Sequence, residues 1–139
     1  MAITQAMCSS FKGELLGGTH DLDTDVIKIA LYTSSAALSA ATTAYAATNE
    51  VVGTAYVAGG NILGTPVISV TGTTGICDFA DSTWATATIT ARGALIYNAS
   101  KANRAIAVID FGADKTSTAG DFTVIMPVAA AATAIIRIS

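Results

Sequence analysis

Three aspartates at alternate positions have the spacing in this chain that comes closest to a known chemistry. Asp21, Asp23 and Asp25 imitate the start of a calcium-binding loop. The loop of a helix–loop–helix calcium site requires Gly at its sixth position and Glu at its twelfth. This chain has Val26 and Tyr32 there, so that class of site is excluded. Two interpretations stay open: an irregular calcium site on the alternate carboxylates, or a solvated turn before a strand.

Few other side chains are arranged for catalysis. His20 is the only histidine, no nucleophile stands at a recognisable spacing from it, and the G-x-S-x-G motif is absent. A structural or surface role for His20 is therefore favoured over a catalytic one. The Cys/His spacing does not fit zinc, and Gly59-Gly60 lacks the spacing of a P-loop or dinucleotide site. We expect no enzymatic activity and no cofactor.

The two cysteines, Cys8 and Cys77, are expected to be buried free thiols. No N-terminal segment combines a basic start with the apolar core of a secretory signal. Disulfides are rare in proteins that stay in a reducing compartment. A single Cys8–Cys77 disulfide is the alternative. Asn98-Ala99-Ser100 matches the glycosylation acceptor pattern, but without a signal we interpret it as a turn.

Composition limits the partners that this chain can bind. Its 139 residues are 52% hydrophobic and only 12% charged, against about 25% charged in a typical soluble domain. Low charge suits a protein packed against other proteins, and a plain Ala-rich β domain is the alternative. The net charge of −3 and the scattered basic residues argue against nucleic-acid binding. The longest apolar stretch, Val124–Ile136, is shorter than the roughly 20 residues of a membrane helix, so no membrane partner is expected.

One stretch of strong alternation organises the predicted fold. Apolar and polar residues alternate with period two from Trp84, as in a β-strand. Gly93 predicts a bulge or a bend, and Ala94–Tyr97 is apolar on both parities, as in a sheet covered on both faces. After the turn chemistry of Asn98–Asn103, alternation resumes over Arg104–Phe111. We expect a long hairpin, Trp84–Tyr97 with Arg104–Phe111, at the centre of the domain.

The remaining segments predict further strands, one helix and two long loops. Ser9–Leu16 has helical spacing and is followed by Gly17-Gly18. The loops are Thr33–Glu50 and Gly112–Asp121. The other expected strands are Val26–Tyr32, Val51–Val57, Ile62–Thr71 with Pro66 marking an edge, Ile76–Ala80, Phe122–Val128 and Thr133–Ile138.

Turn signals recur about every 8–12 residues, which favours a sandwich or a small barrel. We therefore predict a single all-β domain over residues 1–139: a jelly-roll-like sandwich or small barrel of about eight short strands with one short N-terminal helix. Residues 1–7 form a first strand or an extended arm.

Several blocks resemble small structural proteins of tailed bacteriophages. They are WATATITARGALIYN…RAIAVIDFGADKTSTAGDF, the upstream FKGELLGGTHDLDTDVIKIALYTS and TTAYAATNEVVGTAYVAGGN, and the terminal TAIIRIS. Together they cover most of the chain, and size and composition look most like the capsid cement (decoration) proteins of this group. The resemblance implies a jelly-roll-like fold, self-association into homodimers, and binding to the major capsid protein on the outer capsid surface of a virion assembled in the host cytoplasm.

Four residues are candidate contacts for that role. Ile3 and Met7 lie in the N-terminal arm, and Leu38 and Tyr45 lie in the long loop; neither segment has an assigned core face in the sequence pattern. Tyr45 is the best single anchor, because a rigid amphipathic ring gains contact area at low entropy cost. The alternative functions are a tail-associated or adsorption protein that binds host glycans, which exposed aromatic residues on one rim would support, and a small enzyme, which the residue inventory opposes.

Overall fold

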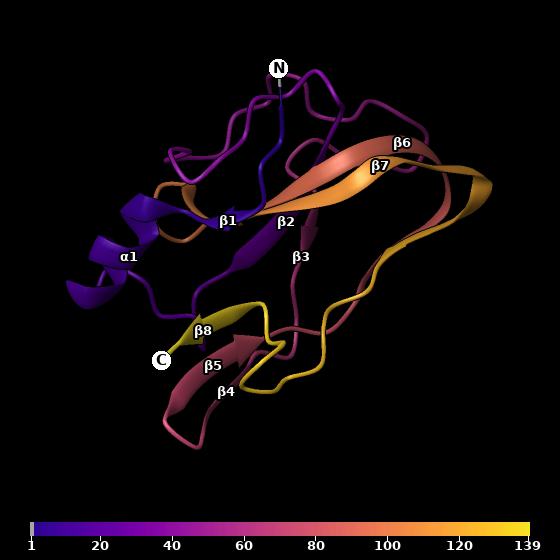
Figure 1. The fold of residues 1–139 in the computed structure, drawn as a ribbon. Coiled ribbons are helices and arrows are strands. Elements are labelled where there is room, and N and C mark those ends of the chain that lie inside the picture. The colour runs from indigo at the N-terminus through magenta and orange to yellow at the C-terminus, as the bar shows by residue number, and fades with distance from the viewer. Residues whose placement is uncertain (1) are drawn as a thin grey trace.

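The computed structural model describes residues 2–139, which form two antiparallel sheets (Figure 1). The first sheet has the strand order β1-β7-β6-β2-β3, and the second has the order β4-β5-β8. The strands are β1 (Ala6–Met7), β2 (Ile27–Tyr32), β3 (Asn61–Ile62), β4 (Val67–Thr71), β5 (Thr74–Asp78), β6 (Ser82–Asn98), β7 (Arg104–Val124) and β8 (Ile136–Ile138). The predicted all-β fold is confirmed. The jelly-roll arrangement stays a prediction.

The hairpin of β6 and β7 lies at the centre of the five-stranded sheet, as the alternation predicts. Its pairing runs from Asn98↔Arg104 at the turn to Ser82↔Val124 at the far end. The prediction of a loop over Gly112–Asp121 is wrong, because β7 continues through it. The polar side chains of that segment lie largely exposed on the outer part of the ladder, where Thr116 meets Thr90 at 3.1 Å between hydroxyl oxygens. The side chains of an exposed strand need not alternate between apolar and polar, so this segment lacks the sequence pattern of a strand.

Two irregularities of β6 set which side chains enter the core. The pairing register shifts between Ala91 and Gly93, which confirms the predicted bulge. A Cβ at Gly93 would lie 2.5 Å from the carbonyl oxygen of Ile109, so only glycine fits that approach. A second register shift occurs at Thr86, whose φ is 51°. The buried side chains are at even positions up to Trp84 and at odd positions from Ala87 to Ala91.

Both faces of the five-stranded sheet are covered. In Figure 1 the N-terminal arm and the segment 33–60 lie above it, and the three-stranded sheet lies below. Consequently Leu95 and Ile96, which point to opposite faces, are both fully buried, and β2 is buried along nearly its whole length. Nearly all of the buried apolar side chains form one cluster that includes residues from both sheets.

Some predicted strands are shorter than expected or absent. Val51–Val57 is a loop that touches β6 through a single bridge between Thr54 and Thr88. A Cβ at Gly53 would lie 2.3 Å from the Thr88 carbonyl oxygen, so only glycine fits where this segment approaches β6. Residues 125–135 also lack strand pairing, and β8 is only Ile136–Ile138.

The smaller elements agree better with the sequence. The helix α1 spans Ser9–Leu16, as predicted, and buries Phe11. The predicted extended segment Ile62–Thr71 contains β4, which is an edge strand, and Gly72-Thr73 turns the chain into β5. Within residues 2–139, no helix is long and apolar enough to cross a membrane.

Candidate functional site

The predicted contact residues of the N-terminal arm and long loop are largely occupied within this chain. Ile3 pairs with Leu38 through a parallel bridge, and both side chains are 8% exposed. The sequence pattern assigned no core face to these segments, but the structure places the side chains of Ile3 and Leu38 in the core. Met7 is half-buried in β1, opposite Ala107 of β7. As interface residues all four candidates stay predictions, although burial leaves Ile3 and Leu38 little surface for a partner.

Tyr45 packs against its own chain, at a buried carboxylate that the sequence pattern did not reveal. Its ring stacks on Tyr97 with centroids 4.7 Å apart, and its hydroxyl donates to Glu50 Oε1 at 2.7 Å. The other oxygen, Glu50 Oε2, accepts from the Tyr56 hydroxyl at 2.6 Å and from the Gly59 N–H at 2.8 Å. Glu50 is 7% exposed, so these three donors replace the water that it loses on burial.

All four tyrosines of the chain converge on this cluster. The Tyr97 hydroxyl donates to the Gly59 carbonyl oxygen at 2.7 Å, and the Tyr32 hydroxyl donates to the Ala46 carbonyl oxygen at 2.7 Å. Burial, followed by the hydrogen bond to Glu50, raises the pKa of Tyr45 and of Tyr56. The tyrosines are therefore neutral donors at physiological pH, and the cluster fastens the long loop to β2 and β6.

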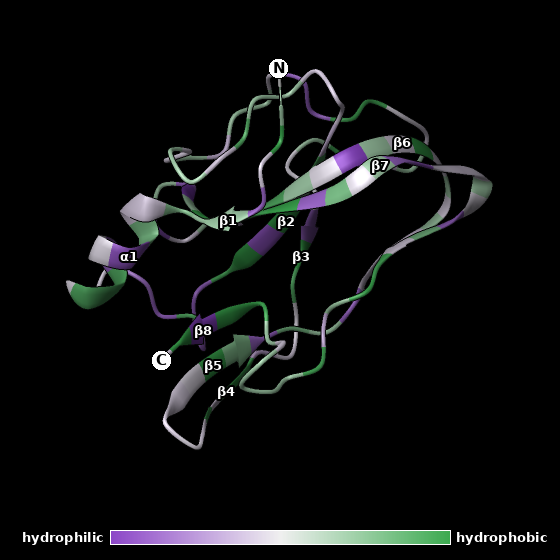
Figure 2. Ribbon diagram, in the orientation of Figure 1, coloured by the Kyte–Doolittle hydropathy of each residue, from purple (hydrophilic) through white to green (hydrophobic). Residues whose placement is uncertain are grey.

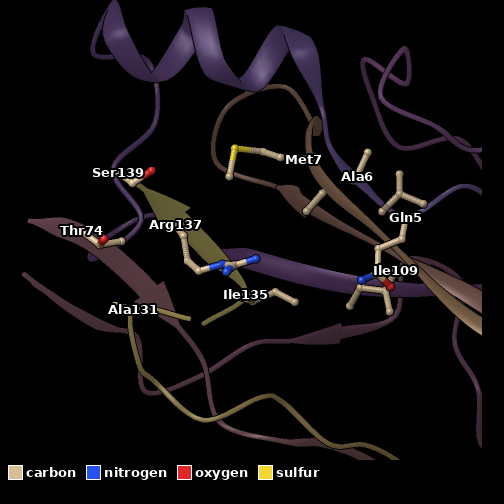
Figure 3. Close-up of a pocket in the computed structure, with 11 residues that line it drawn as sticks. Gln5, Ala6, Met7, Thr74, Ile109, Ala131, Ile135, Arg137 and Ser139 are labelled. Atoms are coloured by element: carbon tan, nitrogen blue, oxygen red, sulfur yellow. The ribbon is translucent and has the colours of Figure 1, made fainter. Parts of the chain in front are cut away.

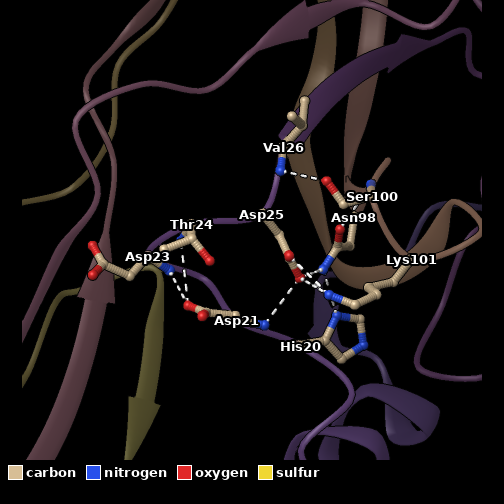
Figure 4. A network of polar contacts seen from close by, with 9 residues as sticks. All are labelled: His20, Asp21, Asp23, Thr24, Asp25, Val26, Asn98, Ser100 and Lys101. Atoms are coloured by element: carbon tan, nitrogen blue, oxygen red, sulfur yellow. Dashed lines mark hydrogen bonds and ion pairs between the residues drawn. The ribbon is translucent and has the colours of Figure 1, made fainter.

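A second polar network joins the turn of the hairpin to the aspartate segment (Figure 4), and His20 extends it to Glu14 of α1. Asn98 is fully buried and donates to His20 Nδ1 at 3.0 Å and to Asp25 Oδ2 at 2.7 Å. His20 Nε2 then donates to Glu14 Oε1 at 2.9 Å, and Arg104 donates to Glu14 Oε2 at 2.9 Å. With both ring nitrogens engaged, His20 has the structural role that the sequence favoured.

The aspartates that resembled a calcium loop are engaged by protein groups instead. Asp21 Oδ1 accepts from the backbone N–H groups of Asp23 and Thr24, as in an Asx turn. Asp25 forms an ion pair with Lys101, with Nζ–Oδ1 at 2.8 Å. Hydrogen bonds from Asn98, Lys101 and the Asp21 backbone lower the pKa of Asp25 to about 2. This geometry favours the turn over the irregular calcium site, and nowhere in residues 2–139 do three His, Cys, Asp or Glu side chains group around a metal position.

Both cysteines are buried free thiols, as predicted. Burial raises the pKa of Cys8 to about 11 and that of Cys77 to about 12. The thiolate is the nucleophilic form of cysteine, so neither residue is set up for chemistry.

A groove separates the edge of the five-stranded sheet from β8 (Figure 3). Its volume is about 520 Å³, with Met7 and Ile109 on one wall and Ile135 and Arg137 on the other. A second hollow of about 640 Å³ shares Ile109, Ile135 and Arg137 and continues along β7. The lining is mixed apolar and polar, which suits contact with a polypeptide.

Large apolar side chains are exposed at several separate places. Figure 2 colours each residue of the ribbon by its hydropathy. The strand β4 is exposed along its whole length, and its face adjoins an open cleft of about 690 Å³ bounded by Leu15 and Leu22. The side chains exposed most are Leu16, Val52, Val57, Ile62, Val70, Ile125 and Val128. The sequence did carry one signal for β4: the segment from Val51 to Cys77 contains no charged residue.

Comparison of this chain with protein-family models, curated proteins and solved structures gave no match.

Proposed function

We propose that this protein is a structural component of a phage virion that binds the outer surface of the capsid and bridges neighbouring capsomers. In that role it stabilises the shell against the internal pressure of packed DNA. Its partners are the major capsid protein and a second copy of itself, its fold is of the jelly-roll-like class, and it performs no enzymatic step. The sequence blocks that resemble phage cement proteins support this proposal.

One structural observation carries the proposal. Exposed apolar side chains occur on both sides of the five-stranded sheet: Val52 and Val57 in the segment above it, and Ile68 and Val70 on the hairpin below it (Figure 1). Monomeric proteins rarely leave large apolar patches uncovered. Bridging requires at least two contact surfaces on one molecule, and exposed apolar side chains on both sides of the sheet support that proposal.

The physics of repeated contacts suits such a bridge. Once one capsomer is bound, contact with the next is effectively intramolecular, so modest interfaces add to a strong attachment. Pulling two capsomers apart then also requires breaking the contacts of the bridging protein. Because the sites recur over the shell, each bridge needs to contribute only a little.

The alternative of a glycan-binding tail protein lacks its expected feature. Such a site would present Trp or Tyr rings on an exposed rim. Trp84, Tyr32 and Tyr97 are buried, and Tyr45 and Tyr56 are only half-exposed. Each of these rings packs into the chain, so no specific observation favours glycan binding.

Fractionation of virions tests the location. Virions of the phage that encodes this chain are dissociated gently, heads and tails are separated, and each fraction is probed by mass spectrometry. We expect the chain in the head fraction, from which mild denaturant releases it before the major capsid protein. Recovery in the tail fraction alone would contradict the proposal.

A further inference from the structure

The outer edge of β4 is the least protected sheet edge in the part of the chain that the structure describes. An unpaired strand edge is a template for pairing with another chain, and proteins usually block it with short strands, charges or bulges. The other edges follow that rule: β1 and β3 have two residues each, and β8 has three with Arg137 at its centre. The outer side of β7 beyond β1 carries Asp114 and Lys115. The outer side of β6 before β2 is contacted by the segment 54–61, through the Thr54–Thr88 bridge and a hydrogen bond from Asn61 to the Thr83 carbonyl oxygen.

In contrast, β4 has five residues, Val-Ile-Ser-Val-Thr, with no charge and no proline. All five are exposed, and Val70 is 75% exposed although it is apolar. Only β5 pairs with β4 within residues 2–139, so its other side offers free backbone groups. In Figure 1 the β4–β5 hairpin projects away from the five-stranded sheet.

We propose that β4 pairs antiparallel with β4 of a second copy of this chain across a two-fold axis at Ser69. The result is a continuous six-stranded sheet, β8-β5-β4 followed by the partner's β4-β5-β8. This inference deepens the self-association within the proposed function by assigning its contact surface.

The sequence of β4 is self-complementary in this register. A two-fold axis at Ser69 pairs all five residues, and a register centred on any other residue pairs fewer. Ile68 then lies opposite the partner's Val70, an apolar β-branched pair of the kind that stabilises sheets. Because side chains alternate across a strand, Ile68 and Val70 of both copies share one face, beside Ile136 and Ile138.

Charge favours a second copy as the occupant. Two chains of net charge −3 repel one another, so they approach best where neither carries charge. The hairpin has no charged residue from Val67 to Cys77, and the carboxylate of Asp78 at the end of β5 is buried. A five-residue strand pair is smaller than a standard interface of roughly 800 Å² per partner. The dimer is therefore expected to dissociate on dilution. Its two copies should associate more strongly where binding to a capsid holds them side by side.

Sedimentation equilibrium of the purified chain over a range of concentrations tests the pairing. We expect a monomer–dimer equilibrium that Val70→Lys weakens about tenfold or more, since lysine on an edge strand opposes pairing. The matched control is Val128→Lys, because Val128 is 74% exposed, lies outside β4, and the variant has the same net charge. It should dimerise as the unmodified chain does. A dimer equally stable in both variants, or a monomer at every concentration, would overturn the proposal.

A cross-linking experiment tests the register. Opposed residues in an antiparallel pair have Cα atoms about 4.5–5.5 Å apart, within the range of a disulfide. Ser69→Cys should therefore form a covalent dimer under mild oxidation, whereas Thr73→Cys in the turn should not. Equal cross-linking of both variants would contradict the register. All of these experiments use the purified chain without capsids, so a negative result would not contradict the proposed location in the head. Conversely, recovery of the chain in the tail fraction would not contradict the β4 pairing.

Discussion

Individual side chains in the central hairpin differ in how much they contribute to the free energy of unfolding. Ile106 of β7 is fully buried, whereas Ile109 is half-buried and faces the groove. We expect Ile106→Ala to lower the free energy of unfolding by about 2–5 kcal/mol, because it leaves a cavity in a packed core. Ile109→Ala should cost clearly less. Urea unfolding of both variants measures this, and an equal loss would contradict the assigned burial.

Asp25 predicts a specific acid dependence of stability. Its pKa falls from the ordinary value of 3.8 to about 2 in the folded chain, chiefly through hydrogen bonds from Asn98 and Lys101. A depressed carboxyl pKa contributes stability that is present above the unfolded pKa and is lost as the pH falls through the folded one. The stability difference between the unmodified chain and Asp25→Asn should therefore narrow between pH 4 and pH 2.

Asp23→Asn serves as the control for that experiment. Asp23 is exposed, and in residues 2–139 its carboxylate accepts no hydrogen bond. This variant removes a charge from the same segment and leaves the hydrogen bonds around Asn98 in place, so it measures the effect of the lost charge alone. A difference for Asp25→Asn that is unchanged down to pH 2 would show that the network around Asn98 does not stabilise the charged carboxylate.

Isolated backbone bridges hold the first half of the long loop between β2 and β3, and a buried side chain holds residues 45–59. Glu50 accepts three hydrogen bonds, from Tyr45, Tyr56 and Gly59. We expect Glu50→Gln to lower the free energy of unfolding by about 2 kcal/mol, because hydrogen bonds to a charged group are the stronger ones. Amide exchange over residues 45–59 should rise at the same time.

A smaller change isolates one of those bonds. Tyr45→Phe keeps the ring that stacks on Tyr97 and removes a single donor, so we expect a loss of about 1 kcal/mol. If Glu50→Gln left the exchange of this loop unchanged, the cluster would not be what holds the loop in place.

The alternation of side chains predicted the elements that are buried on at least one face. The hairpin, β2, α1 and the edge position of β4 follow directly from period two, helical spacing and Pro66. Exposed strand residues such as those over Gly112–Asp121 lack that signal, because burial does not select their side chains. The Glu50 cluster was also unpredictable, since it depends on which loop crosses which strand.

At the scale of the whole molecule, the two sheets share one core, but some of their large apolar side chains are exposed to solvent. Only 12% of the residues are charged, and apolar side chains such as Val52, Val70 and Val128 are exposed on the surface. A protein that acts in repeated contact with other proteins needs exposed apolar surface for those contacts. A freely diffusing protein usually has a more highly charged surface with no large apolar patch. The β4 edge and the surfaces above the five-stranded sheet would face different neighbours in a shell.

Heat-induced release of DNA from phage heads tests the cementing role most directly. Heads are divided into a decorated preparation and one from which the chain has been stripped, and both are heated while DNA release is followed by dye fluorescence. The account predicts that decorated heads release DNA at a clearly higher temperature, and that adding purified protein to stripped heads restores the difference. Release at the same temperature from both preparations would contradict it.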